Sequence, residues 1–130
     1  MEIAREVFDK ALEDFRDSEP LAKGFNISKD NEKGSKGSKF LEAFDLPAEN
    51  SMFGYNGISE SGIYQVNVHG ALNSQYDVEV LAQKLVDYFS VKKRIGNYRL
   101  YPPSSRSGGF KNAPYYTVAV TIHYKRERKL

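Results

Sequence analysis

The chain has 130 residues, which suits one domain, and its formal net charge is +2. It contains no cysteine, which excludes disulfides, thiolate metal sites and cysteine nucleophiles, and its two histidines, His69 and His123, are too few for a histidine-rich metal cage. An apolar fraction of 40% is too high for a disordered protein, and no run approaches the roughly 18 apolar residues of a membrane span. Because the N-terminus is acidic and amphipathic, unlike a signal peptide, we expect one soluble intracellular domain over residues 1–130.

The charges are distributed unevenly along the chain. Residues 1–87 carry nine Lys and Arg against sixteen Asp and Glu, a balance of −7. Residues 88–130 carry ten Lys and Arg against the single acid Glu127, a balance of +9. Such asymmetry points to nucleic acid, to an acidic partner or to self-association of unlike surfaces. The alternative is that the two halves mix in the fold and give a patchwork surface.

The first predicted element is a helix. Apolar residues recur at spacings of three and four from Ile3 to Phe15, which gives one buried stripe, and Pro20 ends the pattern. The next stretch is rich in glycine, serine and lysine and has almost nothing to bury, so we expect a flexible, charged loop at about 24–38.

The middle of the chain predicts two strands and a second helix. Residues 39–46 fit a strand or a short helix, of which the strand is favoured, and the following glycines and serines indicate turns. Residues 62–69 alternate as a half-buried strand does. A capping box of Ser74 and Asp77 is expected to open a helix that extends to Phe89.

The last third of the chain predicts two more strands. Residues 97–101 form a short strand, and 102–114 are expected to be a loop with Gly108 and Gly109 at positive φ. Residues 115–124 show the strongest alternation in the chain, and a basic tail is expected at 125–130. We therefore expect an α+β fold: a four-stranded, mainly antiparallel sheet with two helices packed on one face, in the order α-β-β-α-β-β.

No pattern in the sequence indicates catalysis. Nucleophile elbow, zinc-protease and dinucleotide-binding motifs are absent, so we expect no enzyme activity, no cofactor and no metal. His123 is interpreted as a surface or interface residue and His69 as a strand-end histidine with satisfied hydrogen bonds. Glu13, Asp14 and Asp17 fit a solvated helix face better than a cation site.

A basic stretch at 92–111 keeps nucleic-acid binding open as an alternative function. Cations in it could reach phosphates, and the aromatic residues between them could stack on bases. Two observations weaken this interpretation: Tyr98 and Leu100 are needed in a core, and no recognised RNA-binding signature is present. The residues concerned are Lys92, Lys93, Arg94, Arg99, Arg106 and Lys111, with Tyr98, Tyr101 and Phe110.

The second half of the chain resembles the tail terminator family of tailed bacteriophages. The likeness is in the order of its segments, which are GIYQVNVHG, SQYDVEVLAQKLVDYF, YRLYPPSSRSGGF and YYTVAVTIHYKRE. The pattern is a strand that opens at a glycine, a helix that ends in an aromatic residue, a glycine- and serine-rich tip and a closing strand. It covers about residues 38–126, and the N-terminal helix also fits the start of the family.

The resemblance implies a structural role in the virion tail, with assembly in the host cytoplasm. Such proteins form a ring, usually of six subunits, on the end of the tail tube; the ring stops tube polymerisation and offers a surface to the head. The expected partners are further copies of the chain, the tail tube protein and a head-completion or connector protein. A head–tail joining protein or another minor tail component of the same fold is the alternative. The candidate interface residues are Arg106, Phe110, Lys111 and Tyr115.

Overall fold

The computed structural model describes residues 3–28, 39–48, 51–53, 57–101, 103–112 and 115–129. These residues form two α-helices, one short 3₁₀ helix and nine strands. The helices are α1 (Ala4–Ser18), η1 (Pro20–Ala22) and α2 (Gln75–Ser90). The strands are β1 (Asn26–Ser28), β2 (Phe40–Pro47), β3 (Ser51–Phe53), β4 (Gly57–Ala71), β5 (Arg94–Ile95), β6 (Tyr98–Leu100), β7 (Ser105–Arg106), β8 (Phe110–Asn112) and β9 (Tyr115–Lys129).

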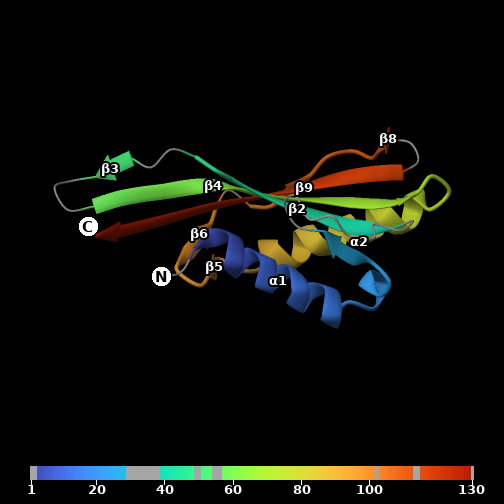
Figure 1. Cartoon of the computed structure of the whole chain (residues 1–130), viewed down its shortest axis with the longest axis horizontal. Coiled ribbons are helices and arrows are strands. Elements are labelled where there is room, and N and C mark those ends of the chain that lie inside the picture. Colours follow the sequence, from blue (N-terminus) through green and yellow to red (C-terminus); the bar gives the residue numbers. More distant parts are fainter. Residues whose placement is uncertain are drawn as a thin grey trace.

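All the described strands belong to one mixed, twisted sheet (Figure 1). Its order is β1-β2-β4-β9-β6-β5, with β3 paired to β4 and both β7 and β8 paired to β9. Only β1 and β2 are parallel among these pairs. The two 15-residue strands β4 and β9 form the middle of the sheet and stay in register from Gly57↔Lys129 to Ala71↔Tyr115.

The expected four-stranded, mainly antiparallel sheet is therefore wrong. The sheet has nine strands among the described residues, and it is mixed because β1 runs parallel to β2. Five of these strands, β1, β3, β5, β7 and β8, have only two or three residues each. So short a segment cannot show an alternation of apolar and polar residues, and its pairing with a long neighbour is what makes it a strand.

Three expected irregular segments prove to contain strands. The loop at 24–38 is wrong for its first residues, because Phe25 is buried in the core and β1 follows it; residues 29–38 lie outside the described part. The basic tail at 125–130 is wrong because β9 extends to Lys129. The loop at 102–114 contains β7 and β8, both paired to β9.

The core lies between the helices and one face of the sheet. Side chains of β4 alternate, so Tyr64, Val66 and Val68 are fully buried under the helices. The pairing register places the odd-numbered residues of β2 and the even-numbered residues of β9 on this same face. Figure 1 shows both α1 and α2 below the sheet. The helices contribute Phe8, Leu12, Phe15, Val78, Leu81, Leu85 and Phe89 to this core.

Two local predictions fail. Ser74 is the N-cap of α2, but its ψ of 30° is outside the extended region, and its side chain accepts no capping hydrogen bond. The described glycines with positive φ are Gly24 and Gly96, so Gly108 and Gly109 do not serve the expected hairpin tip. Gly109 is required for a different reason: the Tyr116 side chain occupies the space in which a Cβ would lie.

Candidate assembly surface

The face of the sheet opposite the helices is the largest surface that the strands position; we call it the open face. No helix in the described part of the chain covers it (Figure 1). Pairing and alternation place alternate residues of β2, β4 and β9 on it, together with Phe110 of β8, which pairs with Thr117. We restrict the name open face to the central part of this surface, made of Phe110 together with Phe40, Glu42, Phe44, Leu46, Ile63, Gln65, Asn67, His69, Ala71, Tyr115, Thr117, Ala119, Thr121 and His123; Lys125 and Glu127 continue the same side of the sheet beyond His123.

The open face is nearly uncharged and partly apolar. Leu46 is 52% exposed and Phe110 46% exposed, while Phe44 and Ile63 are half-buried. Glu42 is the one carboxylate in the defined set, which includes neither lysine nor arginine. Low charge and aromatic side chains are typical of the centre of a protein–protein interface. This surface can therefore contact another protein without desolvating many charges.

A buried hydrogen-bond chain joins three strands on this face. His69 Nδ1 lies 2.8 Å from Thr117 Oγ1, and His69 Nε2 lies 3.1 Å from Glu42 Oε1. Since an ionised carboxylate can only accept, Nε2 donates to Glu42, while Nδ1 bonds the Thr117 hydroxyl, which can donate or accept. The imidazole also stacks on Phe40, with ring centroids 4.4 Å apart. These hydrogen bonds thus link the neighbouring strands β2, β4 and β9.

The order hydroxyl, imidazole, carboxylate is also that of a catalytic triad, but this site is closed to substrate. Thr117 is 1% exposed and His69 is 4% exposed. A nucleophile must reach the scissile group, and a buried threonine cannot do so. We therefore conclude that the hydrogen bonds among Thr117, His69 and Glu42 position the three strands. His69 has both ring nitrogens in hydrogen bonds, in agreement with its interpretation as a satisfied histidine.

The four predicted interface residues do not form one surface. Phe110 and Tyr115 lie on the open face, where Tyr115 meets Phe40 edge to face at 5.2 Å between centroids. Lys111 pairs with Tyr116, so the alternation places it on the opposite, helix-bearing face. Arg106 is on that face too, and its Nε donates to Gln83 Oε1 of α2 at 3.0 Å. Only the aromatic half of the predicted interface belongs to the open face.

Sequence reasoning did not select Phe44, Leu46 and Ile63 as interface residues. A signal for them was present, because Phe40, Phe44 and Leu46 alternate on one side of a predicted strand. Both described α-helices lie on one face of this sheet, so apolar residues of the other face are left without cover from them. The missing information was which side of that strand the helices occupy, which depends on pairing.

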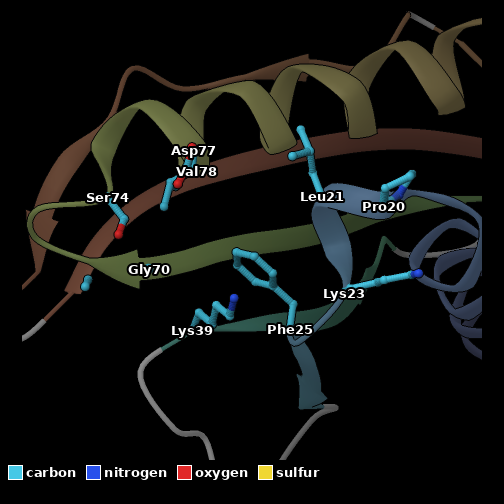
Figure 2. Close-up of a pocket in the computed structure, with 10 residues that line it drawn as sticks. Pro20, Leu21, Lys23, Phe25, Lys39, Gly70, Ser74, Asp77 and Val78 are labelled. Atoms are coloured by element: carbon cyan, nitrogen blue, oxygen red, sulfur yellow. The ribbon is translucent and has the colours of Figure 1, made fainter.

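An open pocket of about 300 Å³ lies between η1, the end of β4 and the start of α2 (Figure 2). Lys39 Nζ lies 5.3 Å from the centre of the Phe25 ring on one wall, and Ser74 and Asp77 of α2 are on the other. The lining offers a lysine and a carboxylate on separate walls, and neither is paired with a histidine or a second acid.

The described residues contain neither a cluster of metal ligands nor a helix of membrane-spanning character. No group of three or more His, Asp or Glu side chains in these segments could hold a metal ion. His123 is half-buried on the open face, and Asp14 and Asp17 are exposed on α1. Neither α1 nor α2 combines the length and the apolar character that a membrane-crossing helix needs.

Comparison with known proteins identifies a similar fold and no function. No protein-family model and no curated protein matches the chain. One solved structure is similar over most of its length, with a TM-score of 0.71 and 21% sequence identity. The likeness covers 93% of this chain and 91% of the other, whose name describes neither a family nor an activity. At this identity the likeness shows a shared fold alone.

Proposed function

We propose that this protein is a structural, non-enzymatic component of a phage tail: a tail terminator that assembles through the open face of its sheet. The open face is the observation that carries assembly. It presents the exposed Leu46 and Phe110 beside half-buried apolar neighbours, and no described helix covers it. The terminator role is supported by the order of segments in residues 38–126, which resembles that family. A ring on the tail tube and a contact with a head-completion or connector protein belong to the same proposal.

The buried position of the triad-like chain supports a role without catalysis. His69 is hydrogen-bonded to both Thr117 and Glu42, and the side chains of His69 and Thr117 are buried. These residues connect three strands at one level, which restrains this part of the sheet as a platform. A rigid platform suits a repeated subunit contact, since little order is lost on docking.

The proposal is tested by introducing charge into the open face. We expect Leu46→Asp and Phe110→Asp to prevent capping, because each would bury a carboxylate in the subunit contact. Val91→Asp is the matched control, since Val91 is 79% exposed at the C-terminal end of α2 and away from the open face. The measurement is electron microscopy of tails assembled with each variant. Arg106→Glu with Lys111→Glu then tests the helix-bearing face in the same assay.

Each result has a defined meaning. A ring density at the tail end and a fixed tail length with wild type and Val91→Asp, both lost with the open-face variants, support the proposal. Tails of normal length that fail to join heads without the protein assign it to head–tail joining. Tails that are indifferent to the wild-type protein refute the tail assignment, and loss of capping by the Arg106 and Lys111 variant alone refutes the open face as the contact.

A further inference from the structure

The end of the sheet at β5 and β6 carries a row of three cations, and the described ion pairs set one carboxylate against it. In the register, Arg94 of β5 pairs with Arg99 of β6, and Arg99 pairs in turn with Lys125 of β9. Directly paired side chains lie on one face within about 5.5 Å of each other, and like charges in this arrangement repel. We call these three residues the cation row. It spans three strands, or roughly 10 Å at the usual spacing between strands.

One carboxylate reaches this row. Glu127 Oε1 lies 3.4 Å from Arg99 and 3.5 Å from Lys125, and it is the single acid of residues 88–130. One negative charge against three positive charges leaves the row with an excess. Because the side chains of Arg99 and Lys125 are about half exposed, the excess faces solvent. An anionic partner with more than one charge would relieve the repulsion along the row.

An aromatic hollow adjoins the cation row. It has a volume of about 400 Å³ and lies between the end of α2 and β6. The half-buried Leu100 supplies an accessible apolar lining above the fully buried Phe89, and Arg99 borders both the hollow and the row. Tyr101 stands at the hollow with 79% of its surface exposed. A flat apolar group could enter the hollow and stack on this ring.

Two lysines add positive charge to the same hollow. Lys93 is exposed, and its backbone carbonyl accepts a hydrogen bond from the Leu100 amide at 3.0 Å, which fixes its position beside β6. Lys92 is half-buried, with its Nζ 4.6 Å from the centre of the Tyr88 ring. The hollow therefore combines an apolar lining, an exposed aromatic ring and cations from two segments.

We propose that the cation row and the aromatic hollow bind a single strand of nucleic acid. Consecutive phosphates lie along Arg94, Arg99 and Lys125, and one unpaired base stacks on Tyr101 in the hollow. A repeated anion beside a flat apolar ring is the chemistry that both features share, and single strands provide both. Duplex DNA keeps its bases stacked internally, and an acidic peptide lacks the ring. Lys125 lies on the same side of the sheet as the open face but beyond its apolar residues, and strand binding does not require tail assembly.

The test is fluorescence anisotropy of the full chain with a labelled 12-nucleotide oligo-dT strand, repeated at several salt concentrations. Three neutralised phosphates predict a log–log salt slope of about −2 for a single strand. Oligo-rU of the same length distinguishes RNA from DNA as the preferred strand. A 12-base-pair duplex and polyglutamate are the competing ligands. The proposal is overturned if the duplex or polyglutamate binds as tightly as the single strands or more tightly. It is also overturned if neither single strand shows saturable binding at low salt.

Variants separate stacking from charge. Tyr101→Ala is expected to weaken binding about tenfold with little change in salt slope, because it removes the stacking ring. Tyr76→Ala is its control: Tyr76 is equally exposed but lies at the other end of α2, about 20 Å away along the helix. Arg99→Gln should reduce the slope by about 0.7, whereas Lys111→Gln on β8 should leave it unchanged.

Unlike Tyr101→Ala and Arg99→Gln, the variant Glu127→Gln is expected to bind the single strand more tightly than wild type. It removes the acid that competes for Arg99 and Lys125, so we expect tighter binding and a steeper salt slope. Equal losses from Tyr101→Ala and Tyr76→Ala, or from Arg99→Gln and Lys111→Gln, would show diffuse attraction to a basic protein in place of a site. Weaker binding by Glu127→Gln would contradict the assignment of the row.

Discussion

Gly70 lies where the first turn of α2 packs most closely on β4. It is buried, and an added Cβ would overlap the Cγ2 methyl of Val78, which is itself fully buried in the core. Valine has one strongly preferred rotamer in a helix, so Val78 cannot easily turn aside. In Gly70→Ala either α2 moves away from the sheet or the valine leaves its rotamer. Both responses strain a close-packed region.

We expect Gly70→Ala to lower the free energy of unfolding by about 2 kcal/mol, within the range for overpacked cores. For a chain of 130 residues this corresponds to a melting temperature lower by about 7 °C. The assay is urea unfolding followed by far-ultraviolet circular dichroism, with an unchanged m-value as the sign that the same transition is measured. Gly108→Ala is the control, since no atom lies within 4 Å of the Cβ that it would add.

A second substitution tests the named contact. Val78→Ala alone removes two buried methyl groups and should cost about 2 kcal/mol. In the double variant the new methyl at Gly70 occupies space that the valine has left, so the combined loss should be smaller than the sum by about 1–2 kcal/mol. Additive losses, or a Gly70→Ala protein within about 0.5 kcal/mol of wild type, would refute the proposed packing.

Two further outcomes follow from the polar groups of the sheet. Thr117→Val keeps the shape of the side chain but removes the hydroxyl that bonds the buried His69 Nδ1, so it should destabilise by about 1–3 kcal/mol in urea unfolding. Thr121 is half-buried on the same face, and Thr121→Val should change the free energy of unfolding by less than about 0.5 kcal/mol. Equal losses from Thr117→Val and Thr121→Val would contradict the stabilising role of the His69 hydrogen bonds. Burial and donation to Asp45 Oδ1 at 2.6 Å raise the pKa of Tyr124 above its ordinary value of 10.0. As the pH rises, the unfolded chain therefore loses this proton before the folded protein does. The contribution of Tyr124 to the free energy of unfolding should be fully present below about pH 10 and should fall above it. Between about pH 8.5 and 11, the free energy of unfolding of Tyr124→Phe should fall less than that of wild type, and an identical fall would exclude Tyr124 as a cause.

The candidate assembly surface shows what a sequence pattern can and cannot supply. Phe110 and Tyr115 were predicted as interface residues and lie on the open face. Arg106 and Lys111 were predicted with them, but the pairing of β7 and β8 with β9 turns them to the other face. A segment of two or three residues has no visible alternation, so its facing direction comes from its partner strand.

The sequence by itself determined the long elements and their buried sides. Apolar spacings of three and four predict α1 and α2, and the structure buries the predicted stripes, from Phe8 to Phe15 and from Val78 to Phe89. The alternation of Tyr116 to Tyr124 likewise places the even-numbered residues in the core. These assignments hold because periodicity is local: each residue's direction depends only on the geometry of its own helix or strand.

Only the tertiary structure decided which segments became neighbours. It added the short strands to the sheet, set β1 parallel to β2 and left one face without a described helix over it. It also brought Arg94, Arg99 and Lys125 into one row across three strands. Such contacts join residues far apart in the chain, and their energy depends on the whole packed arrangement. No local pattern encodes them, which is why the sequence suggested the basic stretch and two aromatic interface residues, but only the folded chain joined Lys125 to that stretch and Leu46 to those aromatic residues.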